Sequence, residues 1–372
     1  MKWFGWKSGR GEARPALMRS AFGYVGVASP PASYEQQVRA AYLGNAIAQR
    51  AVRIVAEGCA GVALTGDEQV RALIAATSGG QALIETVAMQ LLLHGNAYVQ
   101  IGCDADGLPA ELYALRPERV EVEPDARGWP VAYRYRAGEA VTRIAGQDGA
   151  GRAGLVHIRS AHPLDDHYGL GCLGAAAGAI AIHNAAQAWN KALLDNAARP
   201  SGALVYDPGE PGAALSPDQF DRLRAEMEAS FAGAGNAGRP MLLEGGLRWQ
   251  PISLTPAELD FVGAKASAAR EIALAFGVPP LLLGLPGDNT HANYAEANRA
   301  LWRSTILPLT QRITGAIGEG LAGWWPEARI AVDLDAVPAL AAERAMLWGQ
   351  VAAADFLTRD EKRAMVGLAA EG

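Results

Sequence analysis

The chain has 372 residues, of which 50% are hydrophobic, 19% charged and 7% aromatic. At about 150 residues per domain, this length predicts two or three domains with an ample core, and it excludes a small disulfide or metal scaffold. The 33 basic and 39 acidic residues give a net charge of −6. This charge excludes tight nucleic-acid binding over the whole surface, because phosphate affinity comes from lysine and arginine displacing counterions. We expect any contact with DNA to be local and weak.

The cysteines and the apolar runs indicate a cytosolic setting. An odd, sparse set of cysteines without a CxxC pair is typical of reduced thiols; they are Cys59, Cys103 and Cys172. The basic start of the chain shows no apolar stretch of signal-peptide length. The longest uncharged run, residues 168–190, is rich in alanine and glycine and carries His183, Asn184 and Gln187, so we expect no membrane span.

The first part of the chain predicts an arm followed by an α+β domain. Residues 1–33 carry five basic residues before position 20 against one acid, and we expect a mobile arm. Residues 34–57 have helical spacing that ends at Gly58, and a second helix is expected from about Gln81 to the glycine cap at Gly95. Short β-branched or aromatic runs follow at 96–103, 119–123, 131–136 and 155–159, with a glycine-rich stretch at 138–154. They predict one small, mostly antiparallel sheet.

Two long helices are expected in the middle of the chain. The first spans residues 173–196 and has polar residues opposite an apolar face that consists of Ile182, Ala185, Ala186, Trp189 and Leu193. The second begins at a capping box, residues 255–258, and ends at residues 277–280. Its apolar stripe is Leu259, Val262, Ala266, Ala269, Ala273 and Phe276.

A βαββ module is predicted between these helices, over residues 201–254. Strand 203–206 precedes a helix that is capped by Ser216, and strands 241–243 and 247–250 form a hairpin. The stripe of the module helix is expected in its core and consists of Phe220, Leu223, Met227 and Phe231.

The C-terminal part begins with a loop. A third long helix is expected from about residue 294 to 321, with a kink near Pro308, because the proline ring clashes with the preceding turn. A strand at 329–334 and two short helices within 338–372 complete the chain.

The densest polar cluster consists of His162, Asp165, Asp166 and His167. Imidazole and carboxylate groups within six residues could ligate a divalent metal and activate a bound water. The other interpretation, which we favour, is a polar loop between a strand and a helix.

Residues 169–174 match the GxGxxG pattern of dinucleotide sites. Such a site also needs a strand directly before the glycines and an acidic residue about 20 residues later, whereas the next acid here, Asp195, lies at the far end of the same expected helix. The preceding residues here are a polar loop, so we expect a structural role for these glycines.

Five passages, in the same order along the chain, resemble the portal protein (head-to-tail connector) family of long-tailed double-stranded DNA phages. The resemblance runs from about residue 40 to 368. The passages are 95–98 (GNAY), 168–171 (YGLG), 198–202 (ARPSG), 242–247 (LLEGGL) and 271–284 (EIALAFGVPPLLLG). The sequence departs from the family pattern at residues 356–361 (FLTRDE), in place of a glycine-led turn.

The resemblance implies a portal-like subunit, α+β, with a wing, a two-helix stem, a small clip, a kinked helix and a short helical crown. The implied segments are the arm 1–33, the wing 34–172 with strand 329–334, stem helices 173–200 and 255–279, the clip 201–254, the tunnel loop 280–293, the kinked helix and return strand 294–337, and the crown 338–372.

A portal-like function is the implied activity: a ring, usually of twelve subunits, at one capsid vertex, through which DNA is packaged and ejected. No enzymatic activity and no cofactor are implied. The expected partners are further copies of the chain, the major capsid protein, the packaging motor (large terminase), a head–tail adaptor and double-stranded DNA in weak, sequence-independent transit, with no membrane. The expected location is a virion, prophage-derived or gene transfer particle that is assembled in the bacterial cytoplasm.

Candidate site residues follow from this scheme. Short polar side chains of the tunnel loop are expected to touch DNA, namely Asp288, Asn289, Thr290, His291 and Asn293. Channel-facing candidates on the stem are Lys191, Lys265 and Arg270, whose other interpretation is solvated helix faces or intersubunit pairs. Partner-contact candidates on the clip are Glu226 and Glu228. The alternative functions are a metal-dependent hydrolase that uses the His162 cluster and a membrane-associated pore.

Overall fold

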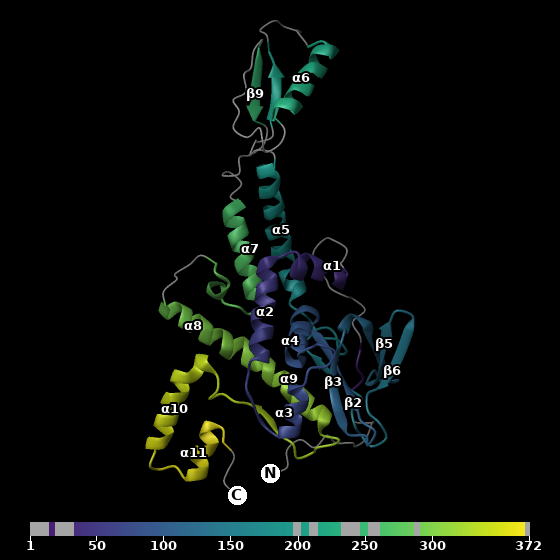
Figure 1. Cartoon of the computed structure of the whole chain (residues 1–372), viewed down its shortest axis with the longest axis vertical. Coiled ribbons are helices and arrows are strands. Elements are labelled where there is room, and N and C mark those ends of the chain that lie inside the picture. Colours follow the sequence, from purple (N-terminus) through teal and green to yellow (C-terminus); the bar gives the residue numbers. More distant parts are fainter. Residues whose placement is uncertain are drawn as a thin grey trace. The chain divides into compact units, whose positions relative to one another are not determined.

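The computed structural model is an α+β structure (Figure 1). It describes residues 15–18, 33–195, 202–207, 215–231, 246–251, 261–285 and 291–368. The chain divides into a first unit, residues 1–177 and 273–372, and a second unit, residues 178–272. Two helices, α5 and α7, contribute residues to both units.

Five helical segments lie within residues 33–95 of the first unit. They are α1 (Tyr34–Val38), the π-helical η1 (Arg39–Leu43), α2 (Ala46–Ala60), α3 (Glu68–Ala75) and α4 (Leu83–His94). Of these, α1, α2 and α3 begin at the capping residues Ser33, Asn45 and Asp67. The side chain of Asn45 accepts hydrogen bonds from Ile47 N and Ala48 N at the start of α2. The predicted end at Gly58 is wrong, since α2 continues through it. A Cβ on Gly58 would lie 2.5 Å from Ile306 Cδ1, so this glycine serves close packing between helices.

The described strands of the first unit form antiparallel sheets. The bounds are β1 (Leu64–Gly66), β2 (Asn96–Cys103), β3 (Pro109–Leu115), β4 (Val120–Pro124), β5 (Pro130–Ala137), β6 (Ala140–Ala145), β7 (Leu155–Arg159) and β10 (Ile330–Val332). The strand orders are β3-β2-β7, β4-β5-β6 and β1-β10. All four predicted runs are strands, but the expected single sheet is two sheets, and β3 and β6 were not predicted. The predicted strand at 329–334 pairs with β1.

Strand β2 is the centre of the first unit because both of its faces are covered. Tyr98 points into a cluster between the two three-stranded sheets, where it packs with Tyr133 and Leu155 among others. On the other face of the sheet, α4 contacts β2 and β3, α9 contacts β7, and α2 packs against both helices (Figure 1). Alternating side chains of β2 therefore enter two different packed layers, and Ala97, Tyr98 and Val99 are all fully buried.

In the C-terminal part of the first unit, residues 291–321 form one continuous helical run, and shorter helices precede and follow it. This part of the chain has the following helical elements. They are the 3-10 helix η4 (Pro280–Leu283), α8 (His291–Leu301), the π-helical η5 (Trp302–Ile306), α9 (Leu307–Leu321), the 3-10 helix η6 (Pro338–Leu340), α10 (Ala341–Ala353) and α11 (Arg359–Val366). Pro308 occupies the first turn of α9, directly after the π-helical turn. The π-helical turn therefore ends where Pro308, which has no backbone N–H to donate, enters the helix. Helix α8 begins at His291, before the predicted residue 294.

The described part of the second unit contains a two-stranded sheet and three helical segments. The elements are α5 (Leu173–Asp195), β8 (Gly202–Tyr206), α6 (Pro217–Phe231), β9 (Leu247–Pro251) and α7 (Phe261–Ala275). Strand β9 pairs with β8, whereas the hairpin expectation paired it with residues 241–243, which lie outside the described residues. In the described part of the chain, no helix combines the length and the apolar character that a bilayer span requires.

The predicted apolar faces of these helices are only partly buried in the single chain. Of the stripe predicted for α7, Ala269, Ala273 and Phe276 are buried, which confirms that part of the stripe, whereas Val262 is 81% exposed. On α5, Ala186 of the predicted face is buried, but Ala179 and His183 are buried beside it and Ile182 is 52% exposed. Phe220 of α6, expected in the core, is 57% exposed, so this expectation is wrong for the single chain.

The expected mobile arm is wrong for residues 15–18. This short segment packs against the turn between β4 and β5, with Leu17 N–H donating to Arg127 O at 2.9 Å. The remainder of the arm, residues 1–14 and 19–32, lies outside the described residues.

Candidate functional site

The loop that leads into α5 is bound to the α4–β2 turn through one buried asparagine. Oδ1 of Asn96 accepts from Gly169 N–H at 2.7 Å, and its amide donates to Gly169 O at 3.1 Å. His157 Nε2 lies 3.0 Å from the same Oδ1, and Ser160 N–H donates to Gly95 O at 2.8 Å. Two of the sequence motifs, GNAY and YGLG, therefore form a single structural junction, which the sequence reasoning had treated as separate passages.

Glycines make this junction possible because backbones approach each other closely. Gly95 has a φ of +81°, and a Cβ there would lie 2.3 Å from Leu170 C. A Cβ on Gly169 would lie 2.1 Å from Gly95 O, and one on Gly171 would lie 2.5 Å from Leu93 O. The first two glycines of the GxGxxG match, Gly169 and Gly171, accommodate neighbouring protein backbone, in agreement with their expected structural role.

Two histidines beside the junction are held in the neutral form. Burial lowers the pKa of His157 to about 3, with the Arg159 guanidinium as a smaller cause. Burial also lowers the pKa of His94 to about 4. His157 stacks on Tyr98 with ring centroids 4.3 Å apart. Neutral imidazoles suit packing and hydrogen bonding at this position, and the sequence reasoning had singled out neither residue.

Half of the His/Asp cluster stabilises its own loop. Asp165 Oδ1 accepts from His167 N–H at 2.7 Å and from Tyr168 N–H at 2.9 Å. The buried ring of His167 places Nε2 2.6 Å from Gly128 O, in the turn between β4 and β5. These bonds are those of an Asx turn and of a satisfied interior histidine.

The other half of the cluster contacts backbone as well. His162 Nδ1 accepts from Leu164 N–H at 3.1 Å, and Asp166 Oδ2 accepts from Met18 N–H at 2.9 Å. Within the described residues, no group of three His, Cys, Asp or Glu side chains is placed to hold a metal ion. The geometry therefore matches the polar-loop interpretation of this cluster.

The stem candidates lie on both long helices of the second unit. Lys191 and Arg270 are exposed, and Arg270 Nη1 donates to Ala266 O at 3.4 Å. Lys265 lies near His183, whose pKa is lowered by burial and, to a smaller extent, by this ammonium group. His183 was not a predicted site residue; its signal in the sequence is a polar residue at helical spacing from Ala179 and Ala186.

The FGVPP motif forms a rigid turn before the expected tunnel loop. Val278 N–H donates to Ala273 O at 2.9 Å, and Thr305 Oγ1 donates to Gly277 O at 2.7 Å. Phe276 is 1% exposed. The turn is therefore tied both to α7 and to the π-helical segment η5.

Of the residues predicted for the tunnel loop and the clip, some belong to helices and the others lie outside the described residues. His291 and Asn293 belong to α8, which corrects their assignment to a loop. Asp288, Asn289 and Thr290 lie outside the described residues. Glu226 and Glu228 belong to α6, and their side chains are not among those described.

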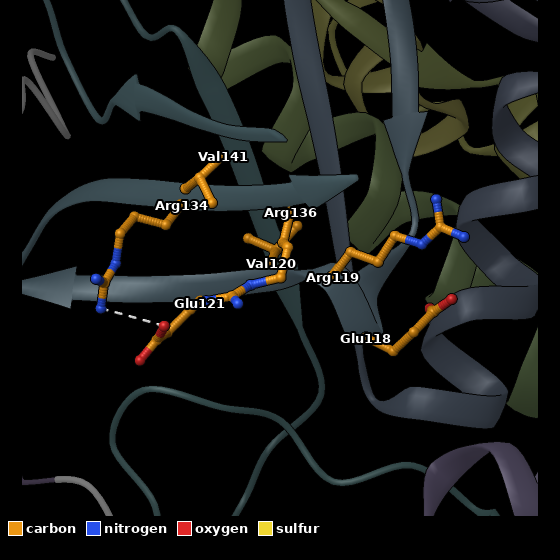
Figure 2. A pocket seen from close by; sticks show the side chains of 7 residues that line it. All are labelled: Glu118, Arg119, Val120, Glu121, Arg134, Arg136 and Val141. Atoms are coloured by element: carbon orange, nitrogen blue, oxygen red, sulfur yellow. Dashed lines mark ion pairs between the residues drawn. The ribbon is translucent and has the colours of Figure 1, made fainter. Parts of the chain in front are cut away.

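A charged pocket of about 210 Å³ lies on the β4–β5–β6 sheet (Figure 2). It is lined by Glu118, Arg119, Val120, Glu121, Arg134, Arg136 and Val141. Arg134 pairs with Glu121 at 3.1 Å, whereas Arg119 and Arg136 have no ion-pair partner among the described residues. Two such guanidinium groups can bind a carboxylate or a phosphate. The signal that could have revealed this pocket is the charge at every second position of RVEVE and YRYR.

A family model described as phage portal protein matches residues 46–367. An uncharacterized protein of Rickettsia bellii (strain RML369-C) is 43% identical over 285 residues, 75% of this chain and 71% of that protein. The portal protein of Enterobacteria phage HK97 is 26% identical over 243 residues, 63% of this chain and 52% of that protein. A chain in the neck of a native gene transfer agent particle, computed with C12 symmetry, is 47% identical with a TM-score of 0.70, over 92% of this chain and 95% of that one.

Proposed function

The chain belongs to the phage portal protein family, and from that membership we propose that twelve copies form a ring whose central channel passes double-stranded DNA into and out of a phage-like particle. One observation carries the proposal: 47% identity and a TM-score of 0.70 to a chain in a particle neck with C12 symmetry, over 92% of this chain. A gene transfer agent or a prophage-derived particle is the corresponding setting, with assembly in the bacterial cytoplasm.

Exposed apolar side chains on the long helices support assembly. In the single chain, Ile182 is 52% exposed, Trp189 37%, Val262 81% and Leu274 78%. Burial of apolar surface contributes about 25 cal/mol per Å². Contact between neighbouring copies would remove these side chains from water, and three of them, Ile182, Trp189 and Val262, were expected on apolar faces from their spacing.

The charge of the ring suits DNA that slides. Twelve copies at −6 each carry about −72, so phosphate is repelled on average and held only locally. We propose that Lys191, Lys265 and Arg270 supply these local contacts. The loop residues 288–290, with His291 and Asn293, exchange hydrogen bonds with successive phosphates, independently of base sequence.

The partners of the ring follow from the same scheme. We propose that the clip, residues 201–254, contacts the packaging motor (large terminase) and later the head–tail adaptor, with Glu226 and Glu228 as contact residues. The wing contacts the major capsid protein. The function is that of a channel and docking platform, without enzymatic chemistry.

Native mass spectrometry and negative-stain images of the purified protein test the ring. We expect closed rings with a central hole, and weaker assembly for Val262→Ser than for Leu108→Ser, because Leu108 is a 47% exposed control on the turn between β2 and β3. A stable monomer that holds stoichiometric zinc would refute the proposal and favour the metal hydrolase.

A packaging assay tests the loop. Replacement of residues 288–291 by a Gly-Ser linker should leave rings intact but reduce the packaging or retention of DNA. Particles that fill and hold their genome normally after this replacement would show that the loop does not act on DNA.

A further inference from the structure

Residues 15–18 lie against the turn formed by residues 125–129. Leu17 N–H donates to Arg127 O at 2.9 Å, and the indole Nε1–H of Trp129 donates to Pro15 O at 2.8 Å. The short segment is therefore held at two of its four residues by groups of one turn.

The HPLDDHYG loop holds the other end of the segment. Met18 N–H donates to Asp166 Oδ2 at 2.9 Å, and Asp166 N–H donates to Met18 O at 3.2 Å. Arg159 Nη1 donates to the carbonyl of Asp166, and His167 Nε2 lies 2.6 Å from Gly128 O, which joins the loop to the turn. The polar cluster that could have been a metal site thus forms one wall of a peptide site.

The turn has its own internal support. Asp125 Oδ1 accepts from Arg127 N–H and from Trp129 N–H, both at 2.8 Å. Gly128 has a φ of +86°, and a Cβ there would lie 2.1 Å from Leu17 O. The absence of a side chain at this position provides the space for the peptide backbone.

We propose that the 125–129 turn and the loop around Asp166 form a binding site for an extended peptide, occupied by residues 15–18 of the same chain. Recognition is through the backbone, because Leu17 and Met18 both use their N–H groups while the Met18 side chain is 76% exposed. The site thereby anchors residues 15–18 to the turn between β4 and β5.

Hydrogen exchange on the full chain tests the site. We expect slowed exchange at the amides of Leu17 and Met18, and an acceleration of at least about tenfold at both in Gly128→Ala, since the added Cβ displaces the segment. Gly138→Ala is the matched control: it has a φ of +62° in the same sheet, and no atom lies within 4 Å of its added Cβ. It should leave both amides protected.

A second variant measures one bond. Trp129→Phe keeps the aromatic ring but removes the donor to Pro15 O, and it should accelerate exchange by about 2- to 10-fold. Exchange of the Val99 amide in β2 should be unchanged in every variant, which separates release of the segment from unfolding.

Three outcomes would overturn the proposal. The first is unprotected Leu17 and Met18 amides in the wild-type chain, and the second is equal protection in Gly128→Ala and wild type. The third is protection that is present only at concentrations where rings form, which would make the occupant a neighbouring copy. If the rings do not assemble, the exchange of the Leu17 and Met18 amides still tests the site, because the site lies within one chain.

Discussion

Replacement of Gly95 by alanine should weaken the first unit through two separable effects. The φ of +81° costs an L-residue about 1–2 kcal/mol. The added Cβ would also lie 2.3 Å from Leu170 C and 2.4 Å from Gly171 N. Both are backbone atoms, so the crowding adds about 1–3 kcal/mol. We therefore expect a loss of about 2–5 kcal/mol in the free energy of unfolding.

Gly80→Ala provides the matched control for this variant. Gly80 has a φ of +78°, and no atom lies within 4 Å of its added Cβ, so only the conformational cost of about 1–2 kcal/mol applies. Urea titrations followed by far-UV circular dichroism compare the two. With a slope of about 1–3 kcal/mol per M, each lost kcal/mol lowers the midpoint by about 0.3–1 M. Equal midpoints for the two variants would refute the close-approach argument.

Three further outcomes can be checked by similar measurements. The pKa values of His157, about 3, and His94, about 4, lie below the ordinary 6.5, so the unfolded chain binds protons first as the pH falls. The free energy of unfolding should then decrease from about pH 6.5 towards pH 3, by at most about 1.4 kcal/mol per pH unit for each histidine; urea titrations at about pH 7 and pH 5 that give the same midpoint would contradict this. Phe276→Ala should cost about 3–5 kcal/mol and Phe220→Ala less than about 1 kcal/mol, because their exposures are 1% and 57%; equal losses of thermal stability would contradict the burial assignment. Thr358→Ala removes the capping box of α11 and should cost about 1 kcal/mol locally, seen as faster amide exchange confined to that helix.

Local chemistry was sufficient to predict many elements. The capping box at Ser216 is present, with Gln219 N–H donating to Ser216 Oγ at 3.3 Å. Gly95 ends α4 in the left-handed conformation, as expected for a glycine cap. The runs 96–103 and 155–159 are the strands β2 and β7. Each of these features depends on residues within one or two turns of chain, so the sequence alone carries the information.

The candidate site was less accessible to sequence reasoning. The motifs marked the family, yet they did not show that Asn96 binds the loop at Gly169, 73 residues later. The charged pocket likewise needs the register that places Arg136 opposite Val141. Hydrogen bonds and pockets of this kind combine residues that no local pattern connects.

The sequence by itself determined the α+β class, most helices and strands, and the family. Only the tertiary structure decided that α2 continues through Gly58, that the glycine-rich stretch contains β6, and that residues 15–18 pack on the β4–β5 turn. It also decided that Phe220 is exposed in the single chain. The physical reason is that periodicity shows which side chains share a face, whereas burial and glycine function depend on which distant segment packs against that face.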